Sequence, residues 1–172
     1  MINTDWLAQL VIRIADQGDL TALEWNGELT HFRRLYQQVY SNACDGKACI
    51  WVVEIPGVGV IGQVFVQFSS GRKELADGES RAYVYGFRVQ PEYRGGGVGT
   101  LLLKRVEQDL VERDFNCVTL NVGRENLAAQ RFYQRNGYTI VAAEPGRWSY
   151  LDHLGRRHDV NEPAWRMQKS LA

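Results

Sequence analysis

The sequence contains few of the residues that cross-link a small protein or bind metal ions. Its 172 residues include three cysteines, Cys44, Cys49 and Cys117, and no two of them form a CxxC pair. An odd number of widely spaced cysteines argues against a disulfide framework and against a zinc site. It is typical of a protein in a reducing compartment, so we expect a cytoplasmic protein. The three histidines form no HExxH pattern, and we expect no bound metal.

Long apolar runs and a net charge are also missing. No run approaches the roughly 20 residues that cross a bilayer, and Met1–Gln9 lacks the basic and then apolar order of a secretion signal. Lys and Arg together number 20, as do Asp and Glu, so the formal net charge is zero. We therefore expect neither a membrane nor a nucleic acid as partner. The oligomeric state is left open between a monomer and a homodimer.

The pattern of apolar residues predicts one α/β domain over residues 1–172. Hydrophobic residues make up 45% of the chain, which is ordinary for a globular protein. Thr30 is the expected N-cap of a helix that follows it. We predict a mixed, splayed sheet of six to seven strands flanked by about four helices. The expected strands are Leu10–Ala15, Ile50–Ile55, Val58–Phe68, Ala82–Val89, Cys117–Val122 and Tyr138–Ala142, with a final hairpin of Trp148–Leu151 and Ala164–Lys169.

The most informative segment is the glycine-rich run Arg94–Thr100. It follows the apolar stretch Tyr83–Val89 and precedes the helical pattern of Leu101–Phe115. A strand, a glycine turn and a helix together form a phosphate-binding arrangement, because glycine permits close approach and the first turn of the helix presents N–H groups. Two common phosphate motifs fail here. No Lys follows Gly99, as a P-loop requires, and a GxGxxG pattern begun at Gly95 would end on threonine.

Two motifs resemble those of the GCN5-related N-acetyltransferase (GNAT) family. Arg94, Gly97 and Gly99 satisfy [RQ]xxGx[GA]. Asn126–Tyr133 matches N-x-x-A-x-x-F-Y, and Asn136–Tyr138 supplies the following G-[FY]. The resemblance implies that acetyl-CoA is the donor and that the glycine run cradles its pyrophosphate. The residues it implies for binding this co-substrate are Phe87, Arg88, Val89, Arg94, Gly95, Gly96, Gly97, Val98, Gly99, Thr100 and Asn126.

The resemblance also implies how the donor is activated. In the family, the strand before the glycine loop splays away from the next strand. The main-chain groups freed there then pair with the pantetheine arm and polarise the thioester carbonyl. In this chain these groups are those of Phe87–Val89. Asn126 and Tyr133 are seven residues apart and therefore lie on one helix face, about 10 Å apart along its axis. Asn126 is expected to contact the pantetheine arm, and the Tyr133 phenol to protonate the departing thiolate.

The base that deprotonates the acceptor amine is not implied by the resemblance. The family position that can carry a glutamate is occupied here by Asn121, and Tyr83–Phe87 contains no acid. Glu54, at the end of a central strand, is therefore the candidate for this catalytic role. The alternatives are Tyr85, Asp152 and His153.

The expected function is transfer of an acetyl group from acetyl-CoA to a primary amine by direct attack in a ternary complex. The acceptor is either a small molecule or a peptide N-terminus, and it is left open among a polyamine, an amino acid, an aminoglycoside-like compound and a protein N-terminus. Two alternatives remain: a non-catalytic acyl-CoA-binding or sensing module, and an acyltransferase that uses a longer acyl group.

Overall fold

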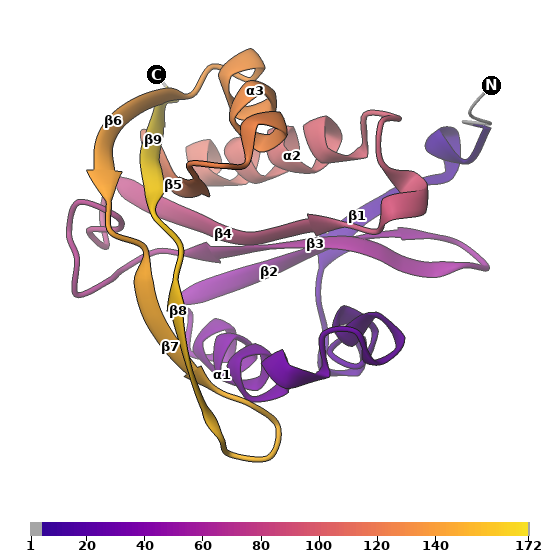
Figure 1. Cartoon of the computed structure of the whole chain (residues 1–172). Coiled ribbons are helices and arrows are strands. Elements are labelled where there is room, and N and C mark those ends of the chain that lie inside the picture. The colour runs from indigo at the N-terminus through magenta and orange to yellow at the C-terminus, as the bar shows by residue number, and fades with distance from the viewer. Residues whose placement is uncertain (1–4, 172) are drawn as a thin grey trace.

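A computed structural model describes residues 5–171 as a seven-stranded mixed sheet with a separate two-stranded ribbon (Figure 1). The strand order in the sheet is β1-β2-β3-β4-β5-β9-β6, and β7 pairs with β8 in the ribbon. This arrangement confirms the predicted mixed α/β fold. The strands are β1 (Val11–Ile14), β2 (Ala48–Ile55), β3 (Gly59–Gln67), β4 (Arg81–Val89), β5 (Cys117–Gly123), β6 (Thr139–Glu144), β7 (Arg147–Leu151), β8 (Arg157–Asn161) and β9 (Ala164–Ser170).

Helices cover both faces of the sheet (Figure 1). Helix α1 (Arg33–Cys44) packs on one face, and α2 (Val98–Glu112) and α3 (Leu127–Arg135) lie on the other. Side chains of β2 alternate between the two layers. Trp51 and Val53 join the core under α2, whereas Ile50 and Val52 join the core under α1. The short 3-10 segments are Asp5–Gln9, Gln17–Asp19, Ala22–Gly27, Thr30–Phe32 and Pro91–Tyr93.

The feature that positions the site is the separation of β4 from β5. These two strands pair in parallel only from Arg81–Cys117 to Val84–Leu120. Beyond this point β4 remains paired with β3, and β5 with β9. The β5-facing edge of β4 from Tyr85 onward is therefore unpaired, as the splayed sheet predicts.

A β-bulge in β4 lies at the start of this separation. Tyr85 pairs with Phe65 and Arg88 with Gln63, so three steps along β4 oppose two steps along β3. Gly86, with a φ of +60°, is the extra residue. Because of the bulge, Tyr85 and Arg88 both face α1, while Phe87 faces α2 and α3.

Two local predictions are wrong. Trp148–Leu151 does not pair with Ala164–Lys169. It pairs with β8, and β9 inserts between β5 and β6. The alternating pattern of the C-terminal segments does not specify a partner, and pairing with a strand on each side, β5 and β6, buries the apolar residues of β9 better than a hairpin would. Thr30 does not cap α1, because a 3-10 turn occupies Thr30–Phe32 and Phe32 takes the N-cap position.

No helix within residues 5–171 is long and apolar enough to cross a membrane. The same residues also place no group of three or more His, Cys, Asp or Glu side chains together as metal ligands.

Candidate functional site

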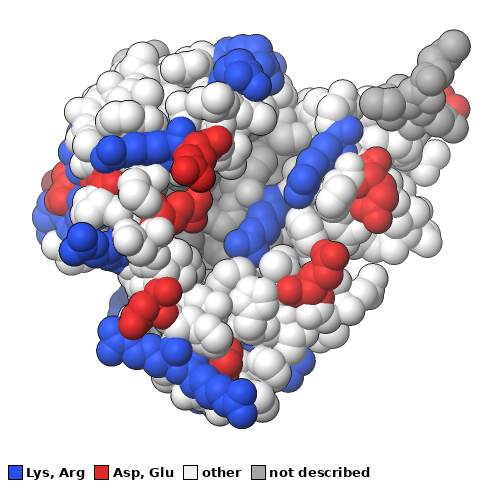
Figure 2. Space-filling view, in the orientation of Figure 1, with Lys and Arg blue, Asp and Glu red and all other residues white. Residues whose placement is uncertain are grey.

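A cavity of about 710 Å³ opens at the separation of β4 and β5. Its lining includes Phe32 and Tyr36 at the α1 side of the sheet and Ala129 and Tyr133 of α3 on the opposite side. The cavity therefore connects the two faces of the sheet through the gap between the strands. The resemblance implies that the donor binds on the α3 side, so we call that side the donor arm and the α1 side the acceptor arm. Figure 2 shows a hollow in the middle of this face, with basic side chains along one side and acidic side chains along the other.

The glycine run forms the turn that the sequence predicts. Gly95 and Gly97 have φ values of +81° and +93°, in the left-handed region, and Gly97 is the N-cap of α2. The first-turn N–H groups of α2 have no acceptor within the helix. An added Cβ at Gly99 would lie 3.3 Å from Phe132 and 3.5 Å from Phe87, so this glycine lets α2 pack closely on α3 and β4.

The end of β4 supplies different groups to the two arms. Phe87 and Arg88 line the cavity, whereas Val89 is buried in the core. The Val89 carbonyl accepts a hydrogen bond of 2.7 Å from Nε of Arg94, which ties the glycine loop to the strand. The Arg88 side chain points away from that loop toward α1, where Nη1 donates to the Tyr36 hydroxyl at 3.0 Å.

Helix α3 brings Asn126 and Tyr133 to the donor arm. The Asn126 side chain accepts a hydrogen bond from the Ala129 N–H at 3.1 Å, so it caps the helix while lining the cavity. The Tyr133 ring contacts Phe87 edge-on, with centroids 6.3 Å apart. Burial, with a smaller contribution from Tyr83, raises the pKa of Tyr133 well above its usual value, so the phenol is protonated at neutral pH.

Glu54 is not brought to this cavity. Its carboxylate accepts a 2.9 Å hydrogen bond from Nε of Arg13, which also pairs with Asp19 at 2.8 Å. The predicted base therefore lies in an ion-pair network between β1 and β2, because the register that pairs Val11 with Glu54 places Glu54 on the same face as Arg13.

Of the alternatives, only Tyr85 lines the cavity. Burial raises its pKa to about 12, so it is a weak proton acceptor at neutral pH. Asp152 and His153 lie at the β7–β8 turn, where Asp152 accepts from the Leu154 and Arg156 N–H groups and contacts His158 at 2.8 Å.

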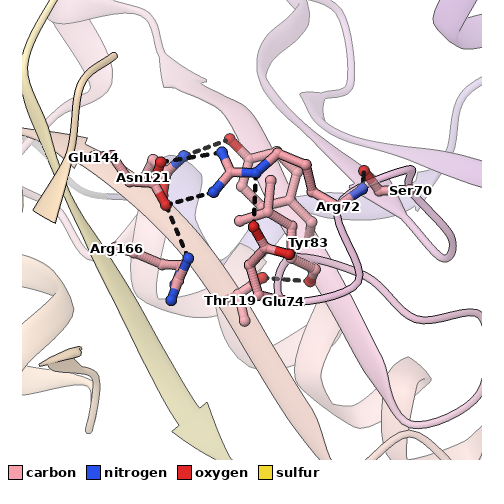
Figure 3. A network of polar contacts seen from close by, with 9 residues as sticks. Ser70, Arg72, Glu74, Tyr83, Thr119, Asn121, Glu144 and Arg166 are labelled. Carbon is pink, nitrogen blue, oxygen red and sulfur yellow. Dashed lines mark hydrogen bonds and ion pairs between the residues drawn. The ribbon is translucent and has the colours of Figure 1, made fainter. Parts of the chain in front are cut away.

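Glu144 lines the cavity and is held by two arginines (Figure 3). Arg72, from the β3–β4 loop, binds both of its oxygens at 2.8 and 3.0 Å, and Arg166 of β9 binds at 2.9 Å. The hydrogen bonds from Arg72 lower the pKa of Glu144 below its usual value. Beside this network, Asn121 donates to the Tyr83 hydroxyl at 3.4 Å, and its own buried oxygen has no partner among residues 5–171.

Glu162 also lines the cavity and, like Glu144 and Arg72, is not indicated by the sequence. It follows β8 in the short connection to β9, and a Cβ placed on Gly123 would be 2.6 Å from its Oε1. The carboxylate therefore lies against the end of β5, where it lines the cavity. A single glutamate in a polar connection carries no sequence signal, since only the pairing of β9 with β5 brings it here.

The match to a family model agrees with this geometry. Residues 12–138 match the acetyltransferase (GNAT) family, which covers most of the chain. The chain belongs to this family, as the two motifs indicate.

Two archaeal relatives are similar in sequence. An uncharacterized N-acetyltransferase of Methanocaldococcus jannaschii is 34% identical over 91 residues, which are 52% of each chain. An uncharacterized N-acetyltransferase of Archaeoglobus fulgidus is 29% identical over 101 residues, which are 59% of this chain and 65% of the relative. The matches thus span between half and two thirds of the relatives' lengths.

Solved structures share the fold over nearly the whole chain. Ard1 from Thermoplasma volcanium has a TM-score of 0.73 at 20% identity and covers 95% of this chain and 99% of its own. A spermidine/spermine N-acetyltransferase of Vibrio cholerae has a TM-score of 0.70 at 20% identity, covering 95% and 94%. Arabidopsis thaliana NAA60 in complex with acetyl-CoA has a TM-score of 0.70 at 20% identity, covering 94% and 98%.

Proposed function

We propose that this protein is an N-acetyltransferase that transfers an acetyl group from acetyl-CoA to a primary amine. The observation that carries the proposal is the single cavity that passes through the sheet between β4 and β5. Such a passage lets a donor enter from the α3 side and an acceptor from the α1 side, so that both meet at one point. Direct attack in a ternary complex follows from this arrangement without a covalent enzyme intermediate.

The groups that suit acetyl-CoA come from the donor arm and from the start of α2, whose glycine loop lies outside the cavity lining. The first turn of α2 offers N–H groups and a favourable dipole to the pyrophosphate. The unpaired edge of β4 is available to the amide groups of the pantetheine arm, in the manner of an added strand. A main-chain N–H near Phe87 would polarise the thioester carbonyl.

Tyr133 is the proposed acid for the leaving group. The amine nitrogen forms a bond to the thioester carbon, and the C–S bond then breaks to release a thiolate. The phenol lines the cavity and makes no hydrogen bond within residues 5–171, so it is available to protonate that thiolate. Its raised pKa keeps the proton in place until negative charge develops nearby.

The test combines ligand binding and turnover. Acetyl-CoA is expected to raise the melting temperature in proportion to its binding, and a panel of amines is then assayed for free CoA. Release of CoA that depends on an amine supports the proposal. No thermal shift at millimolar acetyl-CoA contradicts the donor site, and a shift without turnover on any amine favours a sensing module. Comparison of acetyl-CoA with butyryl-CoA tests the length of the acyl group.

A further inference from the structure

We propose that the acceptor arm takes an amine that carries a carbonyl or carboxylate group next to an apolar side chain, and that Glu162 binds and deprotonates this amine. The inference rests on the proposed acetyl transfer and names the substrate class of the same site. An α-amino acid and the N-terminus of a peptide share this chemistry.

The position of Glu162 is fixed by its main chain. Its N–H donates to the Gly146 carbonyl at 2.9 Å. Gly146 has a φ of +67°, and a Cβ there would overlap the Glu162 carbonyl, so only glycine permits this close contact. The side chain then extends over Gly123, at the end of the strand that borders the gap. This is the point where donor and acceptor would meet.

Glu162 is also the carboxylate that remains available in the cavity. Glu144, the other lining carboxylate, is occupied by two arginines. Glu162 makes no ion pair or side-chain hydrogen bond within residues 5–171. An ammonium group placed between β4 and β5 would therefore find one free proton acceptor. The other charged or titratable groups that line the same cavity are Tyr36, Arg72, Tyr83, Tyr85, Arg88, Tyr133, Glu144 and Arg147.

Arg88 provides the complementary charge in the acceptor arm. Its guanidinium stacks 4.9 Å from the centre of the Phe32 ring and donates to the Tyr36 hydroxyl. It has no carboxylate partner among residues 5–171. A guanidinium held rigidly by an aromatic ring and a phenol, with further donors unused, is suited to a carbonyl or carboxylate oxygen.

Aromatic rings form the wall beside this arginine. Phe32 and Trp148 are stacked with centroids 6.4 Å apart, and Tyr36 and Leu35 line the same arm. Trp148 is 44% exposed, so apolar surface remains available to a ligand. Because Arg88 and Arg147 line this cavity and Glu144 is neutralised, a polyamine with several positive charges fits poorly.

The protons balance in the proposed reaction. Glu162 takes one proton from the ammonium group, and the neutral amine attacks the thioester carbon. As the C–S bond breaks, Tyr133 donates its proton to the thiolate. The nitrogen loses its second proton, which returns to the Tyr133 oxygen through solvent, and Glu162 releases its proton to water. The products are an amide, CoA and one proton.

The first experiment compares acceptors that differ in one group. A leucyl dipeptide, free leucine, 3-methylbutylamine and spermidine are assayed for CoA release with the wild-type protein and with Arg88→Gln. We expect leucine or the leucyl dipeptide to exceed 3-methylbutylamine and spermidine in kcat/KM. Arg88→Gln should lower this value about 10- to 100-fold for the preferred acceptor and much less for 3-methylbutylamine, because only the former has an oxygen for the guanidinium. The two leucine compounds distinguish an amino acid from a peptide.

The second experiment uses the pH dependence of Glu162→Gln. At pH 7 we expect about a 100-fold loss of kcat/KM. With the leucyl dipeptide as acceptor, the α-amine has a pKa near 8 and becomes neutral without help as the pH rises to 9, so the ratio of wild type to variant should fall about tenfold. Glu162→Asp should retain part of the activity. Glu125→Gln, an exposed glutamate outside the cavity lining, is the matched control and should behave as wild type.

The outcomes separate this inference from the proposed function. If spermidine or 3-methylbutylamine is the best acceptor, or if the Glu162→Gln ratio is constant with pH, the inference is overturned while acetyl transfer stands. If acetyl-CoA binds but no amine releases CoA, the proposed function fails, and the acceptor assignment fails with it.

Discussion

Gly86 is the residue whose replacement tests how the site is built. Alanine at this position would retain a φ of +60°, which is unfavourable for an L-residue, and its Cβ would overlap the Phe65 ring, with Cε2 only 2.6 Å away. Phe65 is 1% exposed and packs edge-on against Tyr36 and Tyr85, so a movement of its ring would disturb both contacts. Gly86→Ala should therefore disturb both the bulge and the acceptor arm.

The expected loss of stability has two parts. A left-handed conformation costs an L-residue about 1–2 kcal/mol, and forcing a group into a packed core costs about 1–3 kcal/mol. Together they give about 3.5 kcal/mol. For a chain of this length, each kcal/mol lowers the melting temperature by about 3 °C, so a decrease of about 10 °C is expected.

Gly46→Ala is the control for the backbone term. Gly46 has a φ of +75°, and an added Cβ would meet nothing within 4 Å. Its loss should be about 1.5 kcal/mol, or about 4–5 °C. Calorimetry on both variants, on Phe65→Ala and on Gly86→Ala/Phe65→Ala measures the difference. If the clash is real, the double variant loses less stability than the sum of the single variants. Equal losses for Gly86→Ala and Gly46→Ala would refute the reasoning.

Three other predictions concern individual side chains. Tyr133→Phe should lower kcat about 100-fold while the thermal shift with acetyl-CoA is retained, and an unchanged kcat would remove the phenol as acid. Asn126→Ala should lose about 1 kcal/mol of stability, measured by urea unfolding, because it removes the helix cap. Asn126→Ser keeps the cap, so a weaker acetyl-CoA affinity of the serine variant would show that the Asn126 amide contacts the ligand. Glu144→Gln should lose about 2 kcal/mol at pH 7, because Arg166 loses its carboxylate partner while the half-exposed Arg72 keeps its ion pair with Glu74. The pKa of Glu144 is lowered in the folded state, so its ionised carboxylate contributes to the stability of the fold above about pH 4.5. This contribution is lost as the pH falls through the folded-state pKa. The stability difference between wild type and Glu144→Gln should therefore vanish in acid.

The elements that carry the proposed donor site could be predicted from the sequence because their determinants are local. Gly95 and Gly97 mark positive φ values within one turn, and Asn126 and Tyr133 lie on one helix face. Each signal lies within a single element or at the junction of two consecutive ones. Backbone conformation and helical periodicity are therefore sufficient to place these residues relative to one another.

The acceptor half could not be predicted because its determinants are distant in the sequence. The pairing of β9 between β5 and β6 decides where Glu162 lies, and the alternating pattern of β9 does not choose among partners. The sequence pattern indicates Glu54 because it ends a central strand. The structure uses it instead to neutralise Arg13, an interaction across 41 positions of the chain that no local pattern reveals.

One extra residue in β4 joins the two halves. Without the bulge at Gly86, the alternation of a regular strand would place residue 87 on the same side as Tyr85 and residue 88 on the α2 side. With it, Phe87 packs against Tyr133 in the donor arm and Arg88 reaches Tyr36 in the acceptor arm. The bulge thus both ends the pairing with β5 and distributes consecutive side chains between donor and acceptor. A change that removes it should impair acetyl-CoA affinity and acceptor selectivity together, whereas Arg88→Gln should affect only the acceptor.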